Sequence, residues 1–283
     1  QCMLQGGRHV ADVGVLYPIA TLQAGSWFGP GKPYDGCVQI PEADYMNVGE
    51  MLALQVRRDF TFVHPEVLDE KCTVSGAEIR LGNEVNSEQY KVFILPGSRA
   101  IHLSTLKKVR KFYDNGGKVI ATTRLPDASA EFGKDADVRE IVAAMFGTNA
   151  VSESASSCVK SNAKGGKAYF IASPGPAAIK AALDDALPVG DVVFESDVAI
   201  QGGNLSYIHK VVDGRDIYFF GNSSATPVDV AVRLRGKHKL QAWNPHTGGI
   251  TDCESTVTSE QGGAATRIRL KLDQVQSIFI VGE

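Results

Sequence analysis

The sequence has little of what marks several large classes of protein. It contains no apolar run of about 18 residues, so no membrane-spanning helix is predicted. Acidic and basic residues nearly balance, 32 against 29, for a formal charge of −3. A nucleic-acid partner, which requires a basic stripe, is therefore not expected. The chain begins at Gln1 without a basic and apolar leader, and we interpret it as a piece of a longer protein.

Patterns that bind metals and cofactors are also missing. The five cysteines lie far apart without a CxxC pair and are interpreted as buried or incidental thiols. The six histidines form neither HExxH nor HxH, so no zinc site is expected. The glycine- and proline-rich stretch at 25–36 lacks the GxGxxG order of a phosphate cradle. We therefore expect no metal and no cofactor.

The stretch 90–125 predicts the core of the first domain. Two short apolar runs, 92–95 and 119–121, flank an amphipathic segment at 103–115, which is the pattern of a βαβ unit. Strands without polar alternation are typical of a parallel sheet that helices cover on both faces. Further strands are predicted at 8–17, 59–63 and 167–172, a small hairpin at 72–85, and helices at 44–57, 136–146 and 174–187. The predicted fold of residues 1–196 is a doubly wound, mostly parallel α/β sheet.

The pattern of apolar residues changes after residue 187, where helical spacing ends and short alternating strands are predicted. Two of them meet across Asp213-Gly214, a strong hairpin signal. The predicted strands lie at 205–212, 215–222, 227–234, 238–243, 265–272 and 276–282. Residues 197–283 are therefore predicted to form an antiparallel β-sandwich.

Any catalytic residues are expected at the carboxyl ends of the parallel strands, because α/β proteins place ligands there. The sequence His64-Pro65-Glu66 resembles the histidine and glutamate of the class I glutamine amidotransferase triad, and the α/β layer resembles that fold. The turn after the second apolar strand, where the triad cysteine is expected, reads Thr122-Thr123. Ser98 also follows a strand but lacks a GxSxG context. No catalytic residue is predicted.

Four aromatic and polar side chains are candidate contacts to a glycan or to a neighbouring domain. Trp27 and Tyr34 lie in the loop at 25–36, and Trp243 and His246 lie at the end of a sandwich strand. An aromatic ring beside a polar turn can stack on a sugar, or it can anchor the local core. Both interpretations stay open at this point.

Several segments of the chain resemble glycoside hydrolase family 106. They are YIHK at 207–210, DIYFFGNS at 216–223 and LQAWNPHTG at 240–248, with VADVGVLYP at 10–18 and YKVFILP at 90–96 upstream. The resemblance implies an amidotransferase-like domain and a C-terminal sandwich of a bacterial, usually exported enzyme that removes α-L-rhamnose from plant or microbial glycans. The catalytic carboxylates of that family lie in an N-terminal (β/α)₈ barrel, and no position here matches them.

The resemblance leads to a functional prediction for the chain. We expect a non-catalytic C-terminal accessory region, whose partner is the catalytic barrel of the same parent protein and whose location is periplasmic or extracellular. The alternative is a carbohydrate-binding or assembly module that contacts an oligosaccharide. A free-standing degenerate amidotransferase is a third reading, which would need a nucleophile beside His64.

Overall fold

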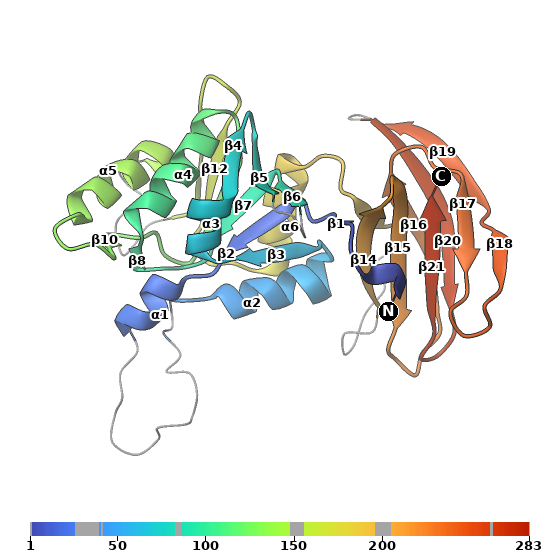
Figure 1. Cartoon of the computed structure of the whole chain (residues 1–283). Coiled ribbons are helices and arrows are strands. Elements are labelled where there is room, and N and C mark those ends of the chain that lie inside the picture. Colours follow the sequence, from blue (N-terminus) through green and yellow to red (C-terminus); the bar gives the residue numbers. More distant parts are fainter. Residues whose placement is uncertain are drawn as a thin grey trace, which may run out of the picture.

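The computed structural model describes residues 2–25, 40, 42–82, 87–147, 156–195, 205–260 and 263–282. Figure 1 shows two parts side by side, an α/β layer drawn in blue, green and yellow and a β-sandwich drawn in brown to red. None of the helices in the described residues has the length and apolar character that a membrane crossing requires.

A six-stranded sheet forms the centre of the α/β layer. Five strands run parallel, in the order β12-β9-β7-β2-β3, and β11 joins the β12 edge in the antiparallel direction. Ile94 of β7 lies opposite Val15 on one side and Ile120 on the other. The strands are β2 (Val13–Leu16), β3 (Phe60–Val63), β7 (Val92–Leu95), β9 (Lys118–Thr122), β11 (Cys158–Ser161) and β12 (Lys167–Ile171).

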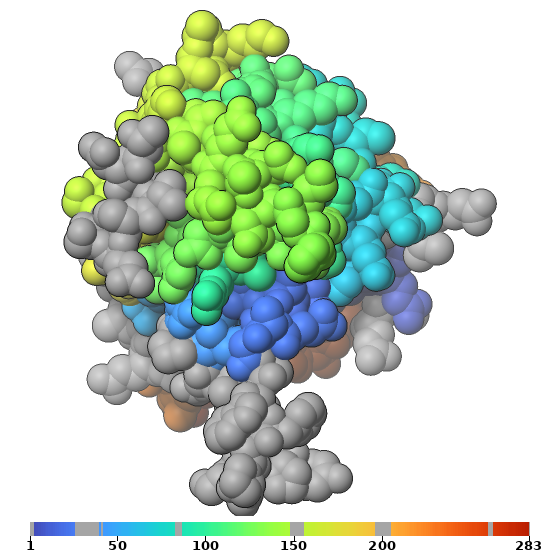
Figure 2. Space-filling view, turned by 90° about the vertical axis from the view of Figure 1, so that its left-hand side faces the viewer, coloured from blue at the N-terminus to red at the C-terminus, as the bar shows by residue number. Residues whose placement is uncertain are grey.

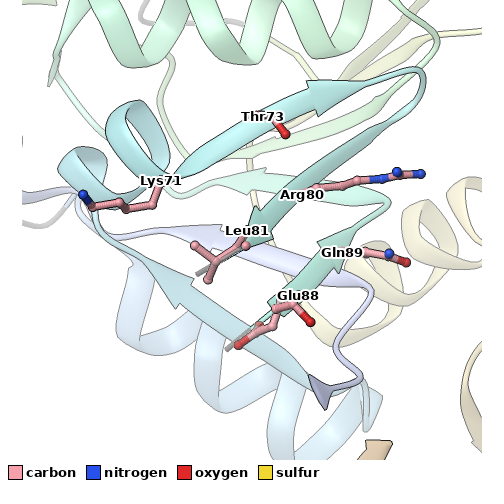
Figure 3. A pocket seen from close by; sticks show the side chains of 8 residues that line it. Lys71, Thr73, Arg80, Leu81, Glu88 and Gln89 are labelled. Carbon is pink, nitrogen blue, oxygen red and sulfur yellow. The ribbon is translucent and has the colours of Figure 1, made fainter. Parts of the chain in front are cut away.

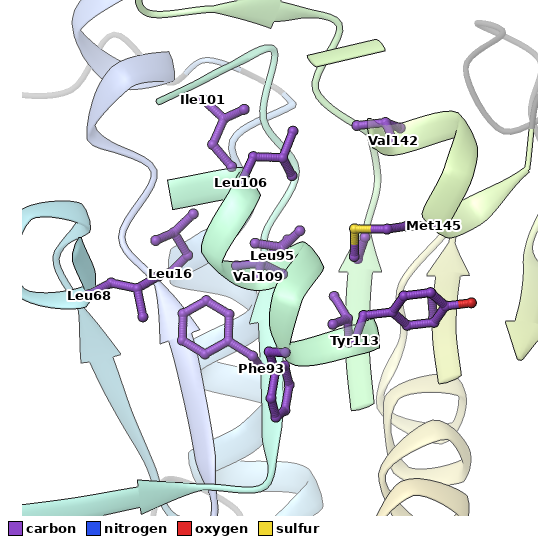
Figure 4. Packing of buried hydrophobic residues seen from close by; sticks show 14 of the residues in the cluster. Leu16, Leu68, Phe93, Leu95, Ile101, Leu106, Val109, Tyr113, Val142 and Met145 are labelled. Atoms are coloured by element: carbon purple, nitrogen blue, oxygen red, sulfur yellow. The ribbon is translucent and has the colours of Figure 1, made fainter. Parts of the chain in front are cut away.

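Helices cover both faces of this sheet, which explains its almost continuous apolar strands. Phe93 and Leu95 of β7 pack with helices on one face, whereas Val92 and Ile94 pack on the other. Figure 4 shows Phe93 and Leu95 in the cluster with Leu106. The first face carries α3 (Pro65–Lys71), α4 (Leu103–Asp114) and α5 (Asp135–Phe146), and the second carries α2 (Tyr45–Glu50), η2 (Met51–Val56) and α6 (Pro176–Ala186).

The predicted βαβ unit is confirmed. Helix α4 connects the parallel strands β7 and β9 and buries the apolar positions that its sequence spacing indicated. These are Leu103, Leu106, Val109, Phe112 and Tyr113. Figure 2 shows α4 and α5, in green, side by side on the end of the molecule that faces away from the sandwich.

Two predicted elements are more elaborate in the structure. The helix predicted at 44–57 changes after Glu50 from α-helical to π-helical geometry, and it ends at Arg57 in the left-handed region with φ 55°. The predicted hairpin is a three-stranded sheet of β4 (Cys72–Ser75), β5 (Glu78–Gly82) and β6 (Ser87–Tyr90). Short additional elements are α1 (Ile19–Gly25) and the parallel pair β8 (Ala100–Ile101) and β10 (Ala128–Ser129).

Two antiparallel sheets form the sandwich and enclose one apolar core. One sheet has the order β1-β14-β15-β21-β17-β18 and the other β13-β16-β20-β19. The first contains β1 (Arg8–His9), β14 (Leu205–Val212), β15 (Arg215–Asn222), β17 (Leu240–Trp243), β18 (Ile250–Asp252) and β21 (Ser277–Gly282). The second contains β13 (Val192–Phe194), β16 (Val228–Arg235), β19 (Ser255–Glu260) and β20 (Gly263–Leu272).

The chain passes between the two parts twice. The prediction of one strand over 8–17 is wrong: β1 pairs with β14 of the sandwich, and β2 lies in the central sheet. The break between the two strands falls at Asp12, whose carboxylate forms ion pairs with basic side chains between the two parts. Strand β13 also pairs in the sandwich, with β16, so sandwich pairing begins before the predicted division at residue 197, which lies outside the described residues.

Candidate functional site

The carboxyl edge of the central sheet brings together a carboxylate and three hydrogen-bond donors. Asp44 precedes α2 and is buried. Its Oδ1 accepts from the Gly97 amide at 2.7 Å and from the Thr122 hydroxyl at 3.0 Å, and its Oδ2 accepts from the Thr123 hydroxyl at 2.6 Å. Gly97 lies just beyond β7, Thr122 is the last residue of β9, and Thr123 follows it. Sequence reasoning identified the threonine positions but missed Asp44.

Thr123 holds an unusual backbone conformation at this edge. Its φ is 55°, in the left-handed region that a β-branched residue rarely adopts. Its amide donates to Ile171 O at 2.9 Å, which ties the turn to the next strand. A strained residue directly after a parallel strand is one part of a nucleophile elbow, but no helix opens in the described residues directly after Thr123, and the Thr123 hydroxyl donates to Asp44.

The other catalytic candidates from the sequence have structural roles. His64 lies at the N-terminus of α3, where its Nδ1 accepts from the Glu66 amide at 3.3 Å and its ring stacks on Tyr17. Ser98 is buried, and its amide donates to Arg124 O. The structure does not bring Ser98 into hydrogen-bond contact with His64, so these two residues form no nucleophile and base pair among the described contacts.

A second cluster of charged groups lies between the α/β layer and the sandwich. The Arg235 guanidinium at the end of β16 contacts Asp12 at 2.5 Å and Asp191 at 3.2 Å. Lys91 also contacts Asp12, at 2.9 Å. Burial raises the pKa of the Asp12 carboxyl, but Arg235 and then Lys91 outweigh this effect and hold that pKa below its usual value.

The cluster continues into the sandwich through His209 of β14. Its Nδ1 lies 2.7 Å from Asp191 and its Nε2 lies 2.9 Å from Asp216. Burial alone lowers the pKa of His209, but the two carboxylates reverse the effect, and the net result is a raised pKa. His238 lies 3.5 Å from the other oxygen of Asp216.

A third polar group joins β1 to the edge of the central sheet. His9 Nε2 lies 2.7 Å from Asp59, and the Asp59 amide donates to the Tyr207 hydroxyl at 3.0 Å. Burial lowers the pKa of His9, but the hydrogen bond with Asp59 leads to a net increase. Thr61 donates to Glu88 at 2.6 Å beside this pair. The cluster around Arg235 and the group around His9 therefore both connect elements of the α/β layer with strands of the sandwich.

The four predicted contact residues have different outcomes. Trp27 and Tyr34 lie outside the described residues. Trp243 is half-buried against Ile217 and Phe279 on the outer face of the larger sandwich sheet, and its indole donates to Gln241 at 3.1 Å. His246 is exposed at the following turn, with Nε2 3.3 Å from the Ser277 amide. The use of these side chains in binding stays a prediction.

A pocket of about 270 Å³ lies on the three-stranded sheet of the α/β layer. Two of its charged groups are already paired, Arg80 with Glu78 at 2.9 Å and Glu88 with Tyr90 at 3.1 Å. Figure 3 shows its lining, which includes Lys71, Thr73, Arg80, Leu81, Glu88 and Gln89. Across the described ranges, no three histidine, cysteine, aspartate or glutamate side chains are grouped closely enough to hold a metal ion.

Comparisons with known proteins connect this fold to sugar-cleaving enzymes. The structure is similar to a rhamnosidase from Novosphingobium sp. PP1Y, with TM-score 0.64, 20% identity, and coverage of 98% of this chain and 23% of that chain. It is also similar to a beta-galactosidase from Bacillus circulans sp. alkalophilus, with TM-score 0.58, 12% identity, and coverage of 96% and 41%. At these identities the likeness shows the fold.

The sequence comparisons specify the family. A Formosa agariphila protein with the provisional name beta-glucuronidase is 26% identical over 284 aligned residues, which are 99% of this chain and 20% of that protein. These relatives place the chain with proteins related to glycoside hydrolases. The family profile described as alpha-L-rhamnosidase matches residues 41–256, and the chain belongs to this family, glycoside hydrolase family 106. The chain spans about a fifth of the length of the curated relative.

Proposed function

We propose that this chain is a non-catalytic C-terminal accessory region of an α-L-rhamnosidase-like glycoside hydrolase, and that it supports a catalytic barrel N-terminal to it in the parent protein. The observation that carries the proposal is the combination of a family match over residues 41–256 with coverage of only 20% of the curated relative. The chain aligns along nearly its whole length with a small part of a much larger protein.

The chemistry of the described residues supports an accessory role. Glycoside hydrolysis needs two carboxyl groups that flank one bond, about 5–10 Å apart in an accessible cleft. The buried carboxylates Asp12 and Asp191 are instead paired with cations between the two parts of the chain. Asp44 is held by three donors at the edge of the sheet. None of these three is left open to a substrate.

The finer architecture is part of the same proposal. The α/β layer, which takes up most of residues 1–196, is an amidotransferase-like doubly wound domain whose triad has been lost, and residues 197–283, together with β1 and β13, form the C-terminal sandwich. The replacement of the elbow cysteine by Thr123 and the capping role of His64 support this reading. The parent is a bacterial enzyme exported to the periplasm or beyond, as is usual for the family.

The test compares this chain with the full-length product of its gene on an aryl α-L-rhamnoside. An aryl β-glucuronide is assayed in parallel, because of the name that the curated relative carries. We expect activity only in the longer protein, and loss of its thermal stability when this region is deleted. Turnover by the chain alone would overturn the accessory role and return attention to Thr123 and His64.

The second candidate function is a carbohydrate-binding or assembly module. The observation that favours it is the half-buried Trp243 beside the exposed His246, because a ring with one free face can stack on a sugar. A glycan-binding screen of the chain and of Trp243→Ala, checked for folding by circular dichroism, tests it. Binding that depends on Trp243 supports this function, and the absence of any glycan ligand removes it.

A further inference from the structure

The hydrogen bonds around Asp44 come from residues far from it in sequence. Its three donors, Gly97, Thr122 and Thr123, are 53 to 79 positions away along the chain. They belong to the ends of two adjacent parallel strands, β7 and β9, so the central sheet fixes their positions. Asp44 itself comes from the segment that leads into α2. The sheet, and not the segment that carries Asp44, therefore sets the positions of the donors, which we call the cradle.

The cradle is built for an anion. One backbone N–H and two hydroxyl groups converge on the two oxygens of one carboxylate, and hydrogen bonds from donors to an ionised acceptor are among the strong ones. The side chain that they hold is only 7% exposed. The three donors are a backbone amide and two hydroxyl groups, which carry no formal charge and stabilise the carboxylate through their dipoles.

The backbone segments around the cradle approach one another closely at Gly97. A Cβ atom added at Gly97 would lie 2.0 Å from the Glu42 carbonyl oxygen and 3.0 Å from Thr123 Cβ. The segment that carries Asp44 therefore lies directly on the donor at Gly97, which only a glycine permits. Truncation of Asp44 to alanine removes only its carboxylate group, so the vacated position has the size of formate and is smaller than a tetrahedral phosphate.

We propose that the ends of β7 and β9 form a carboxylate-binding site that the protein fills with its own Asp44. The Gly97 amide is fully engaged, because it already donates to Asp44 Oδ1. The Asp44 carboxylate is an internal ligand, and it fastens the start of α2 to the sheet. A free monocarboxylate of the size of formate binds in its place once the side chain is removed. This inference does not depend on the proposed accessory role.

The test is chemical rescue of Asp44→Ala. We expect this variant to melt at a lower temperature than the wild type, and sodium formate to raise its melting temperature in a saturable way, as a ligand of the folded state does. Sodium chloride and sodium phosphate at matched ionic strength should leave the deficit in place. The double variant Asp44→Ala, Thr123→Val keeps the space but loses one donor, so formate should bind it at least about tenfold more weakly.

Two results would overturn the proposal: formate raising the melting temperature of the wild type as much as that of the variant, or chloride restoring stability equally well. If Asp44→Ala does not fold, Asp44→Asn, which keeps the volume of the side chain, replaces it in a double-mutant cycle with Thr123→Val. The two substitutions should then be strongly non-additive in urea unfolding. Additive effects would show that Thr123 and Asp44 do not act as one site.

Discussion

The Nδ1 atom of His209 lies 2.7 Å from a carboxylate oxygen of Asp191 in a buried contact between strand β14 and the segment that leads out of the α/β layer. The second carboxylate oxygen of Asp191 is 3.2 Å from Arg235, which also binds Asp12 of the α/β layer. A single carboxylate thus connects a strand histidine to the cation that joins the two parts of the chain. The contact between these parts therefore depends on the ionisation of its members.

This relationship predicts how stability changes with pH. The pKa of folded His209 is raised, so its stabilising contribution is fully present below the unfolded value of about 6.5 and is lost as the pH rises through the folded pKa. Urea unfolding should show lower stability at about pH 8.5 than at about pH 6. The variant His209→Gln should show a smaller difference between the two pH values.

Two further variants test the assignment to His209. His9 also has a raised pKa, so His9→Gln combined with His209→Gln should remove most of the pH difference. His246→Gln, at an exposed turn, should keep the wild-type difference. If His209→Gln loses as much stability between the two pH values as the wild type, His209 is not the group that titrates.

Substitution of Arg235 should lower the free energy of unfolding more than substitution of most other charged residues in the chain. Its removal leaves Asp12 and Asp191 with fewer cations in a buried setting, and breaking such a pair costs about 3–5 kcal/mol of unfolding free energy. We expect Arg235→Met to show a loss in this range in chemical denaturation. The matched control is Arg269→Met, because the pair of Arg269 with Asp229 is exposed and should contribute little to stability. Equal effects of the two variants would contradict a special role for Arg235.

Gly97 should not tolerate even one additional methyl group. The Cβ of an alanine would overlap the Glu42 carbonyl oxygen at 2.0 Å, so Gly97→Ala should lose about 3 kcal/mol, the upper part of the range for overpacking. Gly82→Ala, where no described residue lies within 4 Å of the added atom, is the control and should unfold like the wild type. A wild-type unfolding midpoint for Gly97→Ala would show that the segment at Glu42 moves away easily.

The turn between β14 and β15 should depend on its glycine. Asp213 and Gly214 have φ values of 49° and 79°, as a two-residue turn with both positions left-handed requires. Valine is strained in this left-handed backbone conformation, so Gly214→Val should lower the free energy of unfolding by about 1–2 kcal/mol. Asp213→Asn gives the preferred Asn-Gly pair and should unfold at the same or a higher urea concentration. A destabilised Asp213→Asn would mean that the Asp213 carboxylate has a separate role.

The sequence predicted the elements whose signals are local. The βαβ unit around Leu106 and the hairpin at Asp213-Gly214 were recovered because helical spacing, apolar runs and turn residues lie close together in the chain. The split of the segment at 8–17 was missed, since only tertiary contacts of Asp12 with Arg235 and Lys91 reveal the break.

The residues of the candidate site could likewise be predicted only where their sequence signal is local. The threonines at the end of β9 could be located by counting from the apolar run, because the elbow directly follows a strand. Asp44 could not, because its donors are 53 to 79 residues away and its sequence context is that of an ordinary residue before a helix. The glycan contacts predicted at Trp27 and Tyr34 lie outside the described residues and stay predictions.

The two passages of the chain between the α/β layer and the sandwich have a mechanical consequence. One enters through β1 and Asp12, and the other leaves through Asp191 and β13. A body attached by a single strand can swivel about any axis, whereas two attachments leave free rotation only about the line that joins them. A sandwich excised at one cut would also lack β1 and expose the edge of β14. We therefore expect the two parts to behave as one unit when the chain is truncated or transferred into another protein.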